Sequence, residues 1–382
     1  PLWADSNIDF VGIDNYMPLS DWRDGVDHLD AQAGWPAIHD RAYLLSNING
    51  GEGFDWYYAS DADRANQIRT AITDGAAAKP WVFRTKDLRS WWSNRHYDRP
   101  GGVESPTPTA WVPQSKPIRF TELGCPAIDR GTNQPNVFVD PKSAETEVPY
   151  FSRGWRDDAI QRAYLEATYL WWSDPANNPI SPISGSRMVH VPECAAWTWD
   201  ARPYPFFPEL TDVWTDGENW RLGHWLTGRL GAVSLAALVR HLCRRAGMRD
   251  EQIDVSGLWG AVEGYVIGAL ESPRASIANL ARHFGFDAVE SEGRIRFVMR
   301  GRAPTTTITV DTMVAVDQNE VLELIRSQET ELPQALKWQV ARADEDYDAA
   351  IVEARRITVD TTRIASESFP MAVPPEEAER RC

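Results

Sequence analysis

Short apolar runs that end in polar residues predict the strands of the first half of the chain. The run Ile118–Pro126 reads I-R-F-T-E-L-G-C-P, in which apolar positions precede a glycine and a proline that end it. This pattern predicts a short buried strand that opens into a loop, with Glu122 near its carboxyl end. The runs Ile8–Ile13 and Ala195–Trp199 have the same form, and polar residues follow both of them.

A helical pattern follows the middle run. Between residues 155 and 171, apolar side chains recur near every 3.6 positions, and two adjacent aspartates fall where the helix dipole favours acidic groups. Strands that alternate with helices predict a parallel sheet, and such sheets gather functional groups at the carboxyl ends of their strands. We therefore expect Tyr16, Glu122 and Trp199 to converge on one rim.

A long insertion separates the first two predicted strands. It holds about a hundred residues, far more than an ordinary connection between a strand and a helix. A glycine-rich turn at Gly50–Gly53 and a helix at Asp61–Thr73 are predicted inside it. Insertions of this length at such a rim commonly form lids or binding walls.

From about residue 230 the pattern changes to that of an α+β domain. Helices are predicted after Ser234 and after Ser272, and a hairpin is predicted around Glu292–Gly293. Further predicted elements are the strands Thr305–Val310, Leu336–Val340 and Ile357–Val359 and a helix that begins near Pro374. We therefore divide the chain into domains at 1–230 and 231–382, and we find no catalytic set in the second.

Composition narrows the classes of partner. The formal charge of −16 and the lack of a basic stripe argue against a nucleic-acid partner. The most apolar window, Leu258–Leu270, is too short for a membrane span and contains Glu263. The 18 tryptophans are concentrated before residue 226, and we expect most of them in the core, with two or three at a ligand.

Spacing of cysteine, histidine and glycine predicts neither a metal site nor a cofactor. The four cysteines lack zinc-binding spacing, and Cys125 and Cys194 are expected at opposite ends of the sheet, so we expect free thiols, mostly buried. Gly50–Gly53 is not followed by the Lys-Ser/Thr pair of a phosphate-binding loop. Since Pro1 is no initiator, we expect the chain to be a piece of a longer protein.

Several motifs resemble those of known families. T-E-L-G at Glu122 and W-T-W-D at Trp199 resemble the seventh and eighth strands of retaining TIM-barrel glycosidases, and I-D-N-Y at Tyr16 resembles the sixth. Residues 8–230 more closely resemble the barrel-like domain of gene transfer agent and phage tail-tip "host specificity" proteins. The matching motifs are W-W-S-N-R-H-Y-D-R-P-G-G from Trp91, K-P-I-R-F-T-E-L-G-C-P-A from Lys116, W-D-A-R-P-Y-P from Trp199 and N-W-R-L-G-H-W-L from Asn219.

The rest of the chain resembles the phage tail hub domain that follows this barrel, through Leu332–Pro333 and Asp346–Tyr347. The implied fold is α/β: the last strands of a TIM-barrel-like glycosidase fold, followed by a smaller α+β hub-like domain. The implied protein is made in the bacterial cytoplasm and becomes a virion component, a trimeric hub at the tail tip or baseplate. Its implied partners are other tail proteins and host envelope glycan.

The resemblance also implies roles for residues at the rim. Retaining hydrolysis uses two carboxyl groups about 5 Å apart. Glu122 is the implied nucleophile, Tyr16 its hydrogen-bond partner and Trp199 a stacking platform, while the strand that usually carries the acid/base glutamate lies outside this chain. Further candidate substrate-binding residues are Asn15, Asp200 and Arg202. Carboxylates that could replace the missing acid are Asp14, Glu52 and Asp200, each of which we expect to be structural.

Three functions therefore remain open at the level of sequence. The leading interpretation is a structural tail-tip component whose glycosidase-like barrel contacts host envelope glycan. The second is an active retaining glycoside hydrolase on peptidoglycan or cell-surface polysaccharide, with Glu122 as nucleophile. The third is a glycan-binding module without catalysis.

Overall fold

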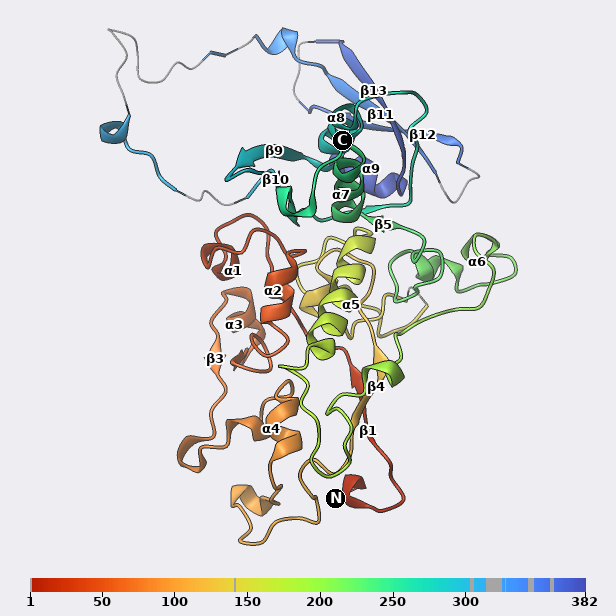
Figure 1. Cartoon of the computed structure of the whole chain (residues 1–382). Helices are drawn as coiled ribbons and strands as arrows, with labels where there is room; N and C mark the ends of the chain where they lie inside the picture. The colour runs from red at the N-terminus through yellow and green to blue at the C-terminus, as the bar shows by residue number, and fades with distance from the viewer. Residues whose placement is uncertain are drawn as a thin grey trace. The chain divides into compact units, whose positions relative to one another are not determined.

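A computed structural model describes residues 2–140, 142–302, 306–313, 325–326, 328–342, 347–357 and 361–382. The chain forms two compact units, residues 1–230 and 231–382, and each contains both helices and sheets (Figure 1). Among the described residues, no sheet closes into a barrel. None of the helices in this part of the chain is long and apolar enough to cross a membrane.

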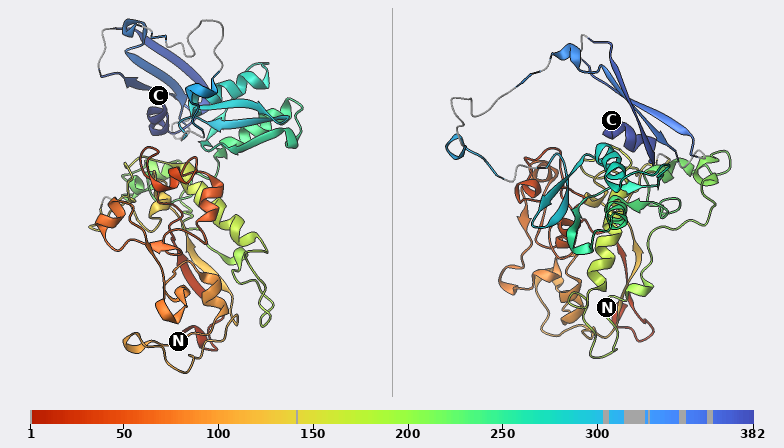
Figure 2. Two further views of the ribbon diagram at one scale, coloured as in Figure 1. Left: turned by 90° about the vertical axis from the view of Figure 1, so that its left-hand side faces the viewer. Right: turned by 45° about the horizontal axis from the view of Figure 1, so that its top comes forward.

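The first unit is built around strand β4, Ile118–Leu123. Strand β1, Val11–Asn15, pairs with β4 in parallel, and both views of Figure 2 show the two strands side by side. On the other side of β4, residues 188–197 form isolated parallel bridges through Val189 and Ala196. Three chain segments therefore run side by side in one direction, as the sequence predicts.

The third of these segments is not the regular strand that we predict at Ala195–Trp199. The 3₁₀ turn Val191–Glu193 interrupts it, and its backbone bonds to β4 are confined to a few residues. The amide of Trp197 donates to the carbonyl of Leu123 at 2.8 Å, and the amide of Thr198, which points to the opposite side of the chain, donates to the carbonyl of His224 at 3.0 Å. Isolated bridges, and not an extended ladder, join this segment to β4.

Helix α5, Asp158–Ser173, packs on one face of the β1–β4 sheet. Asp157 caps it by accepting a hydrogen bond from the amide of Ile160 at 3.1 Å, so the helix begins three residues later than the apolar pattern suggests. The ring of Trp172 meets that of Phe120 edge to face at 6.1 Å. The predicted helix is confirmed, and its buried side orients β4.

The insertion between β1 and β4 contains only short elements. The predicted helix at Asp61–Thr73 is wrong beyond residue 65, because Gln67 has a φ of 53° and the chain then forms a strand that pairs with Trp56–Tyr57. The helices and strands of this insertion are α1 (Leu29–Gln32), α2 (Arg41–Ser46), β2 (Trp56–Tyr57), α3 (Asp61–Ala65), β3 (Thr70–Ala71) and α4 (Leu88–Ser93). Helix α6, Phe206–Glu209, lies after the third segment.

The described residues of the second unit form two larger sheets and three α-helices. The sheets have the strand orders β6-β10-β9 and β12-β11-β13-β8, and β5 pairs with β7. The helices are α7 (Leu235–Arg245), α8 (Pro273–Phe284) and α9 (Pro375–Arg381). The strands are β5 (Val233–Ser234), β6 (Ile253–Gly257), β7 (Ala261–Val262), β8 (Gly264–Tyr265), β9 (Phe286–Ser291), β10 (Arg294–Met299), β11 (Ala335–Ala341), β12 (Ala349–Arg355) and β13 (Ile364–Ala372).

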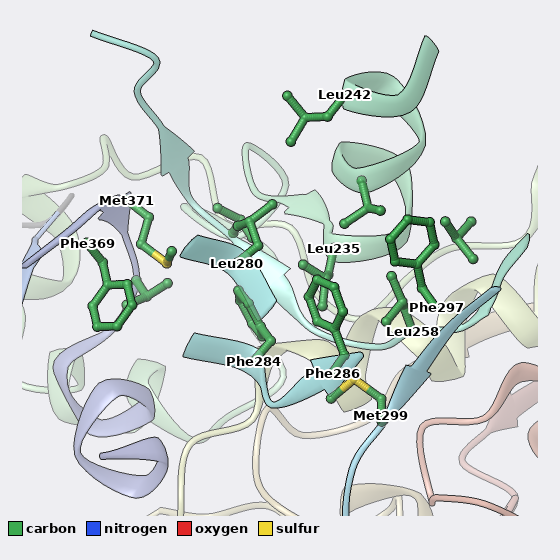
Figure 3. Close-up of a cluster of buried hydrophobic side chains, with 14 of the residues drawn as sticks. Leu235, Leu242, Leu258, Leu280, Phe284, Phe286, Phe297, Met299, Phe369 and Met371 are labelled. Carbon is green, nitrogen blue, oxygen red and sulfur yellow. The ribbon is translucent and has the colours of Figure 1, made fainter. Parts of the chain in front are cut away.

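One apolar core joins these elements. Leu235 and Leu242 from α7, Leu280 and Phe284 from α8, and aromatic side chains from the strands gather in it (Figure 3). Helices α7 and α8 each follow a serine whose side chain accepts a hydrogen bond from an amide in the first turn, which is the cap that the sequence predicts. The unit therefore has a hydrophobic core of its own.

Most sequence predictions for this unit are confirmed, and one is wrong. The hairpin turns at Glu292–Gly293, where both residues have positive φ. Residues 306–309 form no strand and Val310–Thr312 is a 3₁₀ turn, whereas Thr305 of that predicted strand lies outside the described residues. Of the strand predicted at 357–359, only Ile357 is described, and it lies outside any strand.

All four cysteines are free thiols, as predicted. Cys125 and Cys243 are buried, while Cys194 and Cys382 are partly exposed, so half rather than most are buried. Burial raises the pKa of the Cys125 thiol well above its usual value. This cysteine is therefore an apolar core residue, because its reactive thiolate is disfavoured.

Candidate functional site

A one-residue shift in the sheet register brings Glu122 to the open face of β4. Ile13 pairs with Phe120 but Asp14 pairs with Glu122, so Thr121 has no counterpart on β1. Phe120 and Leu123 are buried, whereas Thr121 is exposed and Glu122 partly exposed. A bulge of this kind lets two successive side chains face the same side, which directs Glu122 away from the core.

Tyr16 and Glu122 meet at the carboxyl ends of β1 and β4. The Tyr16 hydroxyl donates a hydrogen bond to Oε2 of Glu122 at 2.7 Å. Burial, followed by this hydrogen bond and the Glu122 charge, raises the pKa of Tyr16 far above its usual value. Tyr16 therefore stays protonated and acts as a donor to the carboxylate.

Two aromatic residues that the sequence analysis did not select surround Tyr16. The ring of His224 lies edge-on to Tyr16 at 5.6 Å, and the ring of Phe138 stacks on His224 at 4.3 Å. Nε2 of His224 lies 2.8 Å from the carbonyl of Pro135, so this nitrogen carries the proton and donates. Burial lowers the pKa of His224 to about 4, which leaves the ring neutral at neutral pH.

The third segment brings Trp197 next to the end of β4. Trp197 is bonded to Leu123 through its amide, and its indole is 39% exposed. A Cβ on Gly124 would lie 2.6 Å from the Trp197 carbonyl and 3.3 Å from the Tyr16 ring, so only glycine fits there. Trp199 follows two residues later and is 61% exposed.

Asp200 and Arg202 are engaged with each other. Nε of Arg202 lies 2.9 Å and 3.0 Å from the two carboxylate oxygens of Asp200, and Nη1 lies 2.8 Å from Asp216. The guanidinium also stacks on Phe207, with its carbon 3.6 Å from the ring centre. This network holds the loop that follows Trp199.

Asn15 is buried at the end of β1, and its side-chain oxygen accepts from the amide of Met17 at 3.3 Å. Its backbone carbonyl accepts a hydrogen bond from Tyr164 on α5 at 3.4 Å. Asn15 therefore shapes the turn that carries Tyr16 to the rim, one position before the residue whose hydroxyl reaches Glu122.

Each of the three substitute carboxylates has a structural partner, as predicted. Asp14 accepts a hydrogen bond from the Thr121 hydroxyl at 2.7 Å, and Glu52 forms a bidentate pair with Arg64 at 2.7 Å and 3.0 Å. Asp200 pairs with Arg202, as described above. Within the described ranges, no group of three His, Cys, Asp or Glu side chains could hold a metal ion.

The geometry thus defines an α/β unit in which parallel segments deliver a phenol and a carboxylate to one rim. Residues 1–208, more than half of the chain, match the family described as the GTA TIM-barrel-like domain, and residues 272–382 match one described as a putative phage tail protein. The chain belongs to the GTA TIM-barrel-like domain family, with a phage tail protein region after it.

A solved structure is also similar to part of the chain. It is described as the virion of a native gene transfer agent (GTA) particle, and the matched chain is 31% identical, with a TM-score of 0.41. The match covers 44% of this chain and 37% of that chain, so this chain spans little more than a third of its length. No curated protein matches the chain.

Proposed function

We propose that this chain is part of a structural component of a gene transfer agent or phage-like particle, located at the tail tip. The observation that carries this proposal is the succession of two family matches, 1–208 and 272–382, in one chain. The first unit is the carboxyl-terminal part of a glycosidase-like barrel, and the second is a hub domain that associates with other tail or baseplate proteins. Trimeric self-association and a role in host specificity belong to the same proposal.

We further propose that the first unit contacts host envelope glycan at the Tyr16–Glu122 rim. The support is chemical: a carboxylate and a phenol hydroxyl lie beside partly exposed aromatic rings, and sugars present both hydroxyl groups and an apolar face. Glu122 can accept hydrogen bonds from a sugar, whereas retaining hydrolysis needs a second carboxyl group beside it. Asp14, Glu52 and Asp200 are engaged with Thr121, Arg64 and Arg202, so none of these three carboxylates is offered for that second role.

Removing residues 231–382 from the full-length protein is expected to abolish its incorporation into particles. The physical reason is that this unit has its own apolar core and, in our proposal, carries the contacts with neighbouring tail proteins. Immunoblotting of purified particles measures incorporation, and a Glu122→Gln variant with both units intact is the matched control. Particles that contain the shortened protein at the normal level would contradict the structural role.

Replacing Glu122 with glutamine is expected to weaken binding to isolated host envelopes about tenfold. The amide can no longer accept a charge-assisted hydrogen bond, which is worth roughly 1.5–3 kcal/mol. Sedimentation of the protein with envelopes measures binding, and a reducing-sugar assay on the same samples measures cleavage. Sugar release that stops in the variant would instead establish the hydrolase, and unchanged binding without sugar release would remove Glu122 from the site.

A further inference from the structure

We propose that the outer face of Phe138 is the stacking surface for a neutral or amino sugar at the Tyr16–Glu122 rim, and that this site discriminates against acidic sugars. This inference rests on the glycan contact proposed above and specifies where and with which class of sugar it occurs. It assigns to Phe138 the platform role that the sequence analysis gives to Trp199.

One face of the Phe138 ring is covered by a buried imidazole, because His224 stacks on it at 4.3 Å with the two planes 25° apart. Tyr16 lies 5.8 Å from the Phe138 ring in a T-shaped contact, with the planes 72° apart. Phe138 remains 44% exposed with both neighbours in place. Since His224 occupies one face, we place the ligand on the face opposite His224.

The Phe138 ring is held in place by His224, which stacks on its covered face. His224 is fixed through Nε2 to the carbonyl of Pro135, three residues before Phe138. The backbone carbonyl of His224 also accepts from the amide of Thr198 at 3.0 Å, which links this support to the third segment of the sheet. An exposed aromatic ring that is backed by a fixed, buried ring loses little conformational entropy when a ligand stacks on it.

Polar groups of Tyr16 and Glu122 lie beside the Phe138 ring. The Tyr16 ring lies 5.8 Å from that of Phe138, and the Tyr16 hydroxyl donates to Oε2 of Glu122. The carboxylate has acceptor capacity beyond the one bond from Tyr16, since each oxygen has two lone pairs. A pyranose ring that stacks its apolar C–H face on Phe138 would therefore have acceptors for its hydroxyl groups close to its rim.

The charge near Tyr16 is negative. The charged groups that act on Tyr16 are Glu122 and Asp14, both of them acids, and both raise its pKa. The chain as a whole carries a formal charge of −16. A uronate, sialate or sulfated sugar would meet repulsion here, whereas a neutral or amino sugar would not.

The test measures binding of soluble oligosaccharides to the protein by calorimetry and NMR titration. The panel contains neutral hexose and N-acetylhexosamine oligomers, a glucosamine oligomer, and an oligogalacturonate as the acidic probe. We expect Phe138→Ala and Phe138→Leu to weaken binding of the best neutral or amino oligomer about tenfold, whereas Phe138→Tyr retains it. The matched control is Phe206→Ala, because Phe206 is also exposed, at 59%, and lies at the start of α6.

The outcomes separate this inference from the proposed function. If the wild-type protein binds an oligomer but Phe138→Ala and Phe206→Ala bind it equally well, the platform assignment is wrong while the glycan contact stands. If the oligogalacturonate binds as tightly as the neutral oligomers, the charge discrimination is wrong. If the wild-type protein binds no oligomer in the panel, the glycan contact and this inference fall together. Equal thermal midpoints of all variants verify that the fold is unchanged.

Discussion

Replacing Asp158 with alanine is expected to lower the free energy of unfolding of the first unit by about 3–5 kcal/mol. Asp158 is buried at the start of α5. Its carboxylate accepts hydrogen bonds from Nε and Nη2 of Arg156, at 3.0 Å and 2.8 Å, and from Nε of Arg229, at 3.0 Å. In the Asp158→Ala variant, two buried guanidinium groups lose this acceptor and its charge. Arg229 also donates to the carbonyls of Trp220 and Trp225, so the change would loosen the segment that ends the unit.

The measurement is urea unfolding followed by tryptophan fluorescence, which reports mainly on the first unit because the tryptophans are concentrated there. Glu166→Ala is the matched control, because Glu166 pairs with Arg162 on the exposed side of the same helix, where such pairs contribute less than about 1 kcal/mol. A loss for Asp158→Ala that is no larger than the loss for Glu166→Ala would show that the buried cluster is not stabilising.

The cluster of Asp158, Arg156 and Arg229 also predicts how the stability of the first unit depends on pH. Its two arginines lower the pKa of Asp158 well below the usual value despite burial. The stabilisation is therefore complete above the unfolded pKa, about 3.9, and is lost as the pH falls through the folded value. The Asp158→Ala variant should lose this part of the acid dependence.

Two buried histidines are expected to make both units lose stability in mild acid. Burial lowers the pKa of His224 to about 4 and, with the nearby Arg381 charge, that of His283 to about 3. Both values lie below the ~6.5 of an unfolded histidine, so the unfolded chain takes up the proton first. Stability should fall by about 1.4 kcal/mol per pH unit for each ring, from near pH 6.5 down toward its folded pKa.

Hydrogen exchange measured by mass spectrometry between pH 7 and 4.5 separates the two units. His224→Gln should flatten the pH dependence of the first unit only, and His283→Leu that of the second only, so each variant is the control for the other. The His283→Leu variant should also raise the free energy of unfolding of the second unit by about 1 kcal/mol at pH 7. The reason is that, in the described structure, neither ring nitrogen of His283 has a hydrogen-bond partner. An unchanged slope in either variant would contradict the assignment.

The sequence predicts those elements whose ends are marked by a capping or turn residue. Ser234 and Ser272 cap α7 and α8, and Glu292–Gly293 forms the turn of the hairpin. In each case the residues at the end of the element supply the side chain or the backbone conformation that the end requires. Strand β4 was predicted for a similar reason, since its apolar run ends at Gly124. Its position also allowed the meeting of Tyr16 and Glu122 to be predicted from strand direction alone.

Elements that depend on distant partners were not predictable in this way. Strands β12 and β13 lie on either side of β11, and the sequence analysis identified only β11 because its apolar alternation is the clearest of the three. The expected strand at Ala195–Trp199 forms only an isolated bridge to β4, and its Thr198 amide donates to His224, 26 positions later in the chain. These contacts arise from the folded chain and not from adjacent residues.

In the candidate site, too, local sequence predicts some residues, whereas others are brought together only by the fold. Glu122 and Tyr16 were identifiable because each lies at the end of a strand-like run. Phe138 and His224 were not, because they come from loops separated by 86 positions of sequence, and only the folded chain stacks one ring on the other. Arg202 is a candidate substrate-binding residue from the sequence, but its hydrogen bonds go to Asp200 and Asp216.

The extra residue in β4 also explains how two acids can share the end of one sheet. Asp14 and Glu122 are register partners, and like charges placed opposite each other on neighbouring strands repel. Thr121, the residue without a counterpart, offers its hydroxyl to Asp14 at 2.7 Å, while Tyr16 serves Glu122. The irregular strand thus acts as a spacer that gives each of the two neighbouring carboxylates its own hydroxyl donor.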